Sequence, residues 1–298
     1  MKSISTLVLL VLLSSTAIKA QKAILISEDS MKFGKSHMNG LTVIIPEVNY
    51  DKTLKAWTKD LQSHSKSKLV TEDGEMSIFG AIIKDIAPNP VNVFSKLMNL
   101  DSTLKLTVVF EVKKDQYIDR SAGETQFKNA KNYLKEFAKT QYIDLAKNQS
   151  EAENKKLRGL ESNFSSLARE KSRLQKSIES AKKTIATENE NISKQKIGVD
   201  SISSQITVQN SELSSMDEGP VKKEKTNYIN GLEKQKKRAQ NSIESSETRI
   251  NKANAEIEKA NSEIPDNEKM QEEVKGKIES QQAVCQKYTD KIKTIGSY

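Results

Sequence analysis

Apolar side chains recur at alternating three- and four-residue steps from Leu157 to Met216 of this 298-residue chain. A repeat of about 3.5 residues places one narrow apolar stripe along a helix, and a stripe this narrow is buried only against another helix. The sequence therefore predicts a coiled coil, with a first helix over residues 123–217. The predicted seam of this helix consists of Leu157, Leu160, Phe164, Leu167, Leu174, Ile178, Ile185, Ile192, Ile202, Ile206 and Leu213.

A second stripe with the same repeat follows, out of phase with the first. The phase changes across residues 217–220, where Gly219 suits the left-handed position after a helix end and Pro220 suits the first turn of a new helix. We expect a second helix over residues 220–296, folded back on the first as an antiparallel hairpin. Pro265 lies inside it, and we expect a kink or a short break there. The second seam consists of Ile229, Leu232, Ile243, Ile250, Ile257 and Ile264.

The hairpin geometry predicts which residues of the two helices lie side by side. A turn centred near residue 218 pairs positions whose numbers add to about 437. Polar residues within the seams favour one register over others. A register that brings opposite charges together is therefore supported by those charges. The sum places Ile292 beside Leu145, Glu188 beside Arg249 and Lys171 beside Asp266. Pairing between helices of different copies is the alternative to pairing within one molecule.

The N-terminus has the composition of an export signal. Lys2 precedes an apolar run over residues 4–13, and small or polar residues follow up to Ala17 or Ala20. The run is too short to cross a bilayer, so we expect a signal peptide over residues 1–20 and no transmembrane span in the mature chain. Cleavage after Ala17, or retention of the run as an anchor, is the alternative. The expected location is the periplasm or the cell envelope, or the exterior after secretion.

Charge and cysteine content limit the classes of partner. The net charge is +8, yet lysine and arginine alternate with acidic residues along the coil, which is typical of a solvated helix surface. No basic cluster with interleaved aromatic residues occurs, so we expect no nucleic-acid binding. The single cysteine, Cys285, excludes an internal disulfide. It falls on the seam, where we expect a small buried side chain, with an intermolecular disulfide as the alternative.

Residues 21–122 follow a different pattern, in which strands alternate with one helix. The run over residues 103–112 alternates apolar and polar side chains, as in a strand, and the period becomes helical over residues 49–64, with Trp57 on the apolar face. This predicts an α+β head with a mostly antiparallel sheet and one packed helix, followed by the long antiparallel coiled-coil hairpin. The side chains expected to cover the other side of the sheet, from the first turns of the coil helix, are Phe127, Leu134 and Phe137.

The sequence contains no convincing catalytic or metal-binding set. The two histidines, His37 and His64, are expected on a loop and at a helix end, without the spacing of a zinc site. Glu72, Asp73 and Glu75 supply too few oxygen ligands for calcium, so we interpret them as a solvated turn. No glycine-rich phosphate loop and no nucleophile-elbow motif occurs. We therefore expect no enzyme activity, no cofactor and no metal.

Several stretches of the head resemble one family of proteins. The stretch SMKFGKSHMNGLTVII at residues 30–45 is followed by KTLKAWTKDL at 52–61, VNVFSKL at 91–97 and LKLTVVFEV at 104–112. Together they resemble an uncharacterised family of exported Bacteroidota proteins with an α+β head and a C-terminal coiled-coil tail. The resemblance covers residues 24–140. It implies export and this architecture, and it implies no functional residues.

Three functions are compatible with this architecture. The leading hypothesis is a non-enzymatic exported protein whose head binds a protein partner or the envelope surface and whose hairpin serves as a spacer or as an assembly element, including in a homo-oligomer. The second is a periplasmic holdase chaperone with helical arms. The third is a secretion or efflux adaptor, since such proteins also carry coiled-coil hairpins.

Overall fold

The computed structural model of the protein describes residues 23–298. The predicted signal segment, residues 1–20, lies outside the described residues, so its cleavage and the export of the protein stay predictions. The described chain forms two compact units. The head unit consists of the residues up to Lys156 together with Gln281–Tyr298, and the hairpin unit consists of Leu157–Ser280. The head unit thus contains the start of one long helix and the end of the other, besides the residues predicted as the head.

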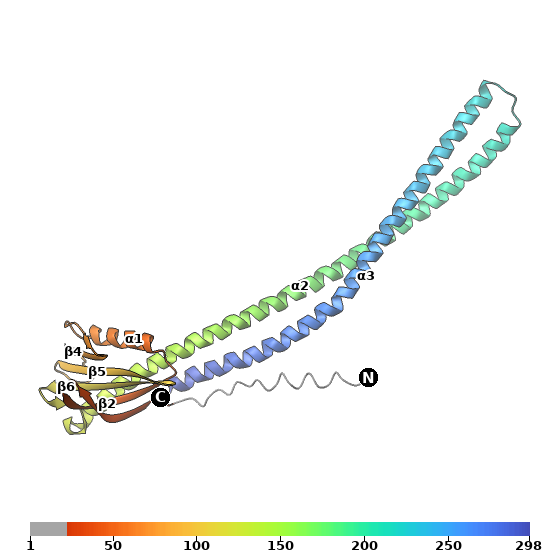
Figure 1. The fold of residues 1–298 in the computed structure, drawn as a ribbon. Helices are drawn as coiled ribbons and strands as arrows, with labels where there is room; N and C mark the ends of the chain where they lie inside the picture. The colour runs from red at the N-terminus through yellow and green to blue at the C-terminus, as the bar shows by residue number, and fades with distance from the viewer. Residues whose placement is uncertain (1–22) are drawn as a thin grey trace, which may run out of the picture. The chain divides into compact units, whose positions relative to one another are not determined.

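The head unit contains one antiparallel sheet of seven strands, and two long helices follow it in the chain (Figure 1). The predicted fold class, an α+β head followed by a helical hairpin, is confirmed. The strand order is β1-β2-β6-β5-β4-β3, with β7 paired to β6. The strands are β1 (Leu25–Phe33), β2 (Ser36–Pro46), β3 (Val70–Glu72), β4 (Glu75–Ala81), β5 (Val91–Leu100), β6 (Thr103–Lys113) and β7 (Gln116–Tyr117), and the helices are α1 (Tyr50–Ser63), α2 (Glu124–Ser214) and α3 (Pro220–Gly296).

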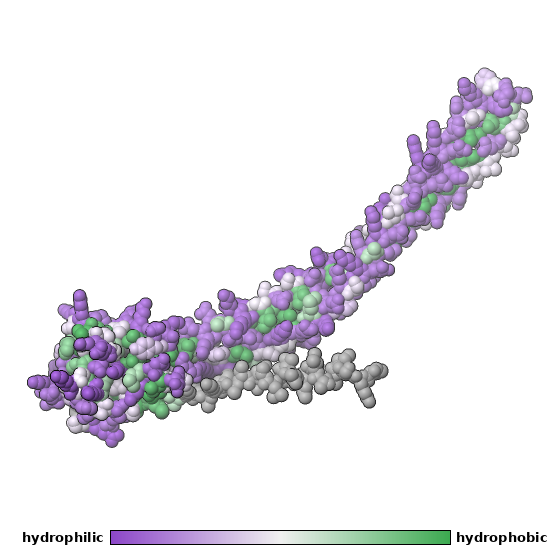
Figure 2. Space-filling model, in the orientation of Figure 1, coloured by the Kyte–Doolittle hydropathy of each residue, from purple (hydrophilic) through white to green (hydrophobic). Residues whose placement is uncertain are grey.

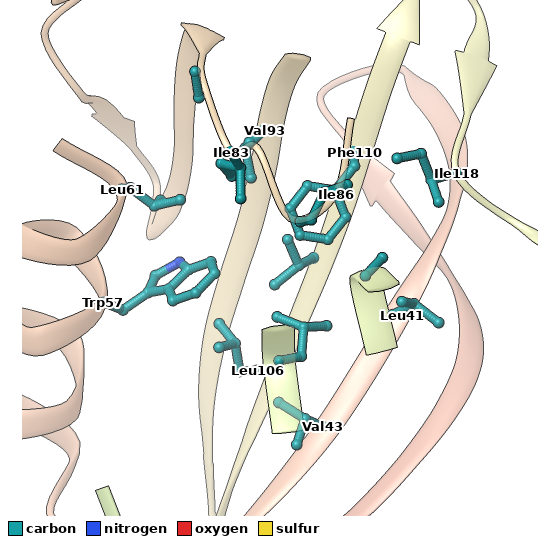
Figure 3. Close-up of a cluster of buried hydrophobic side chains, with 14 of the residues drawn as sticks. Leu41, Val43, Trp57, Leu61, Ile83, Ile86, Val93, Leu106, Phe110 and Ile118 are labelled. Atoms are coloured by element: carbon teal, nitrogen blue, oxygen red, sulfur yellow. The ribbon is translucent and has the colours of Figure 1, made fainter. Parts of the chain in front are cut away.

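Helix α1 covers one face of this sheet. Its first turn is capped by Asn49, whose side-chain oxygen accepts a hydrogen bond from the Lys52 backbone N–H at 3.0 Å. Trp57 is fully buried, and its indole N–H donates to the hydroxyl of Ser95 on β5 at 2.9 Å. Figure 3 shows the Trp57 ring lying between α1 and the strands. The ring therefore packs helix α1 against the sheet, as predicted for this residue, and its one polar group, the indole N–H, is hydrogen-bonded.

Helix α2 begins on the same side of the sheet as α1. Phe127 and Leu134 belong to one core cluster with Trp57 and Leu106, and the Phe137 ring lies 4.9 Å from the Trp57 ring. The prediction that these α2 side chains cover the other side of the sheet is therefore wrong. Strand alternation gathers the aliphatic side chains of β2, β4, β5 and β6 on one face, and that face is where burial of both helices is most favourable.

The end of α3 packs into the head unit. A separate apolar cluster consists of Tyr142, Ala146 and Ile295, with Ile24, Leu145 and Ile292 packed against it. The predicted proximity of Ile292 to Leu145 is thus confirmed. Beside this cluster, the Lys291 ammonium lies 2.6 Å from a carboxylate oxygen of Glu47, and it also lies over the Tyr142 ring, 5.1 Å from its centre. The last turns of the chain are therefore tied to the head by apolar burial and by one ion pair.

The hairpin unit is formed by α2 and α3 alone. Helix α2 ends at Ser214 and α3 begins at Pro220, so the chain reverses between them and Pro220 is the first residue of the second helix, as predicted. The left-handed position expected for Gly219 is wrong: its φ is not positive, and its carbonyl accepts the Lys223 backbone N–H at 3.2 Å in the first turn of α3.

Of the kink or short break expected at Pro265, the break does not occur, because helix α3 continues through this residue; the kink stays a prediction. Proline removes one backbone donor, but the carbonyl left without it belongs to Asn261, an exposed residue whose carbonyl group water can reach.

Candidate functional site

Metal-ligating side chains are the first candidates for a functional site among residues 23–298. No group of three or more His, Cys, Asp or Glu side chains gathers among residues 23–298 in a way that would hold a metal ion. His37 lies in strand β2 rather than in the expected loop, because β1 and β2 form one long hairpin that includes it, and His64 caps the end of α1. Cys285 is buried and free, so the seam position predicted for it is a packing position.

The acidic group around Gly74 forms the turn between β3 and β4. Asp73 and Gly74 both have positive φ, 49° and 77°, which makes a tight hairpin turn. Glu75 pairs with Lys96 on β5, its carboxylate oxygen lying 3.3 Å from the ammonium. The carboxylates are thus part of the sheet surface, which agrees with the interpretation as a solvated turn.

The face of the sheet opposite α1 and α2 is not covered by a helix among the described residues. We call it the open face. It carries an apolar cluster, in which the rings of Phe33 and Phe94 lie 5.0 Å apart and the exposed ring of Phe79 lies 6.0 Å from that of Phe94. Phe79 keeps 48% of its surface in solvent. The open-face cluster consists of Met31, Phe33, Met38, Phe79, Phe94, Val109 and Tyr117.

Gly40 allows this cluster to pack. A Cβ atom at this position would lie 2.5 Å from the Val108 carbonyl oxygen and 2.8 Å from a Val109 methyl group, closer than real contacts allow. Because Gly40 has no side chain, β2 carries nothing here that would push Val109 aside, and Val109 is fully buried on a face without a helix. The open-face cluster is therefore a packed apolar surface with an aromatic rim.

A band of polar side chains lies beside the cluster on the same face. The Lys105 ammonium lies 2.8 Å from a carboxylate oxygen of Asp29, and this contact holds the pKa of Asp29 below its ordinary value. The hydroxyl of Thr42 lies 3.2 Å from the same oxygen and 2.9 Å from the Thr107 hydroxyl. On β5, the Asn92 amide donates to Glu111 at 2.8 Å. These cross-strand pairs are matched within the sheet, so the polar band requires no ligand for charge balance.

A polar hollow of about 740 Å³ lies at the end of the sheet, next to the short 3-10 helix η1 (Arg120–Ala122). Asp119 lines it, but this carboxylate already accepts the Ser121 backbone N–H at 2.8 Å and the Asn39 side-chain amide at 3.2 Å. Its carboxylate is thus engaged in capping η1 and in tying β2 to it. The Ser121 hydroxyl, which also lines the hollow, donates to the same Asp119 carboxylate at 2.5 Å, and the described lining residues form no group of metal ligands.

The predicted seam residues all lie in the hairpin unit, where each is buried or half-buried. Figure 2 shows apolar side chains along the hairpin between hydrophilic flanks. Arg249 binds Glu188 with two hydrogen bonds of 2.7 and 2.9 Å, as the register predicted. Lys171 pairs with Glu268 at 2.8 Å and not with Asp266. Asn267, the residue between Asp266 and Glu268, occupies the buried seam position. The two carboxylates therefore lie on opposite sides of the seam, and Glu268 is the one on the side of Lys171.

Sequence reasoning missed the open-face cluster. A signal was present in β6, where Val109 is the apolar residue among the outward positions Lys105, Thr107 and Glu111. On β5, Phe94 is likewise the apolar residue between two polar outward positions, Asn92 and Lys96. One apolar residue per strand is weak evidence alone, and only the pairing of β5 with β6 and of β6 with β2 brings these residues together.

Comparisons with known proteins assign no family. No protein-family model matches the chain, and no curated protein sequence matches it either. A similar solved structure is a coiled-coil segment of Smc from Pyrococcus yayanosii, with 19% sequence identity and a TM-score of 0.45. The match covers 53% of this chain and 66% of that one, just under two thirds of its length. The resemblance to exported Bacteroidota proteins therefore stays a prediction. Within residues 23–298, none of the helices combines the length and the apolar character that a membrane span needs.

Proposed function

We propose that the protein is a non-enzymatic exported protein whose head binds a protein partner through the open face and whose coiled-coil hairpin serves as a spacer. The open-face cluster carries the first part. It combines buried apolar side chains with the exposed ring of Phe79 and with flanking charged pairs, the composition of a protein-binding surface. Two more exposed apolar side chains, Leu25 and Met98, extend from β1 and β5 on this face.

The regularity of the hairpin unit supports the role as a spacer. Within this unit each helix runs for about 60 residues (157–214 and 220–280), which corresponds to roughly 90 Å at about 1.5 Å per residue. Its buried positions are occupied by the seam, and ion pairs such as Arg249 with Glu188 and Lys171 with Glu268 join the two helices. Such an element holds its two ends at a fixed separation. We expect the mature protein to elute earlier from a size-exclusion column than a globular protein of equal mass, and a compact elution volume would contradict this role.

A photo-crosslinking experiment tests the binding role of the head. A photoreactive phenylalanine analogue at Phe79 should capture a discrete partner in the cells that produce the protein. The matched control carries the same analogue at Lys66, an exposed position in the loop after α1. In a pull-down of the tagged protein without the analogue, Phe79→Glu should lower partner recovery roughly tenfold, because glutamate removes the buried ring from the apolar contact and places a charge there. Lys66→Glu should not change recovery. Equal recovery by both variants would refute binding through the open face.

A holdase function is the second candidate, favoured by exposed apolar side chains on the hairpin near its turn. These side chains are Ile197, Val208, Val221 and Tyr228. A holdase should suppress the aggregation of an unfolded outer-membrane protein, and Val208→Glu with Tyr228→Glu should abolish that effect. Suppression that needs Phe79 instead would assign client binding to the head.

A further inference from the structure

Within the described part of the chain, residues 23–298, strand β1 has an unpaired edge. The strand order places β1 at one end of the sheet, where it pairs with β2 on one side only. It is nine residues long, whereas the strand at the opposite end, β3, has only three. A long free edge presents backbone N–H and C=O groups that accept a further strand, and peptide-binding domains use such edges to bind extended segments.

A groove runs beside this edge, between β1 and the first turns of α2. We call it the edge groove, and its volume is about 420 Å³. Its apolar lining comes from Ile24 and Ile26 on the β1 side and from Phe127 on α2. Its polar lining comes from Glu124, Lys128, Lys131, Asn132 and Lys135.

The three lysines give the edge groove a net positive charge. Lys128, Lys131 and Lys135 are spaced three and four residues apart, so they share one face of α2. None of the three forms an ion pair with a described residue, although Lys131 lies over the Phe127 ring, 4.9 Å from its centre. Only one carboxylate, that of Glu124, lines the same groove. By contrast, Lys105 and Lys96 on the open face are both paired with carboxylates.

We propose that the edge groove binds an extended acidic segment of a partner protein, which adds to β1 as a further strand. Alternate side chains of an added strand point toward α2, and they are spaced by about 6.6 Å. The three lysines extend over roughly 10 Å of the helix axis, so two or three alternate carboxylates match them. The side chains between these carboxylates point toward Leu25, which is 62% exposed, and they are expected to be apolar. This interface shares Leu25 with the open face but uses none of the residues of the open-face cluster, so it does not depend on the proposed function.

The charges decide between an acidic partner and a second copy of this chain. Antiparallel pairing of two β1 strands about a twofold axis would bring the two sets of lysines to face each other on one side of the joined sheet. Like charges directly opposite each other destabilise a strand pair. An acidic segment instead supplies the charge that the groove lacks.

Peptide binding to the full mature chain tests the proposal. The probe is a labelled twelve-residue peptide of alternating valine and glutamate, and its control alternates valine with lysine. The acidic peptide should bind more tightly at low salt than the basic one, and its binding should protect backbone amides of residues 25–33 from hydrogen exchange. A second control is the acidic peptide methylated on every other backbone nitrogen, at the positions that would donate to β1. This peptide should not bind, because it cannot form the backbone hydrogen bonds of an added strand.

Charge reversal on two different helices distinguishes an effect of the groove lysines from an effect of the net charge of the protein. The variant K128E/K131E/K135E should weaken binding of the acidic peptide at least about tenfold. The control K52E/K55E/K59E reverses three exposed lysines with the same spacing on α1 and should change binding less than about twofold. Each variant must retain the buried-tryptophan fluorescence of Trp57, so that a folding defect is recognised.

Three results would overturn the proposal. The first is equal weakening by the two triple variants, and the second is equal binding of the acidic and basic peptides. The third is a concentration-dependent dimer that protects residues 25–33 without peptide, because a second copy would then fill the groove. Phe79→Glu should leave peptide binding unchanged. Failure of the open-face interface and failure of the edge groove are therefore distinguishable.

Discussion

Replacing Ile295 by alanine tests whether the end of α3 is a structural part of the head. Ile295 is fully buried against Tyr142 and Ala146, which lie about half the chain length earlier in the sequence. Truncation of a fully buried isoleucine removes apolar burial and leaves a cavity, which together cost about 3 kcal/mol. For a unit of this size, each kcal/mol shifts the melting temperature by roughly 2–4 °C, so we expect a decrease of roughly 6–12 °C.

The single tryptophan makes this measurement specific to the head unit. Trp57 is fully buried in the sheet–helix core, so its fluorescence follows unfolding of the head, whereas circular dichroism at helical wavelengths is dominated by α2 and α3. The matched control is Ile257→Ala on the hairpin seam, which should lower the helical transition and leave the Trp57 transition in place. A change below about 0.5 kcal/mol in the Trp57 transition of Ile295→Ala would refute the assignment of the chain end to the head.

Three further predictions concern single interactions. Ser95→Ala removes the acceptor of the Trp57 indole N–H, and leaving that donor buried without a partner should cost about 1–3 kcal/mol in urea unfolding. Gly40→Ala places a methyl group against the backbone of β6 and should cost about 1–3 kcal/mol, with the same assay. Arg249 lowers the pKa of Glu188 to about 2, below its ordinary value of 4.5. The resulting stabilisation is present above about pH 4.5 and is lost as the pH falls toward 2. Helical melting curves across this range should show the loss in the wild type and a smaller one in Glu188→Gln.

Local patterns were sufficient where a single element or a repeat carried the information. The helix predicted over residues 49–64 is present as Tyr50–Ser63 with Asn49 as its cap, because capping and the spacing of apolar side chains are short-range effects. The register of the hairpin was equally accessible, as the pair of Glu188 and Arg249 shows. A seam repeated over many turns leaves few registers that bury it, so the period and the position of the turn determine the partners.

Neighbours across the sheet were not accessible in this way. Alternation identifies the two faces of a strand, but it does not determine which strands lie side by side, and both candidate surfaces depend on that order. The edge groove exists because β1 is terminal in the sheet and α2 lies over its inner face, which leaves Lys128, Lys131 and Lys135 without ion pairs. Lysines with this spacing occur on many helices.

The sequence by itself determined the main elements of the head, the hairpin and its seam, since these follow from periodicity and from the change of phase just before Pro220. Only the tertiary structure decided that α1 and α2 share one face of the sheet, that Ile295 packs in the head and that Lys171 pairs with Glu268. The physical reason is the range of the forces. Backbone propensity and apolar periodicity depend on residues close in sequence. Burial and charge pairing depend on residues that are distant in sequence and become neighbours only in the folded protein.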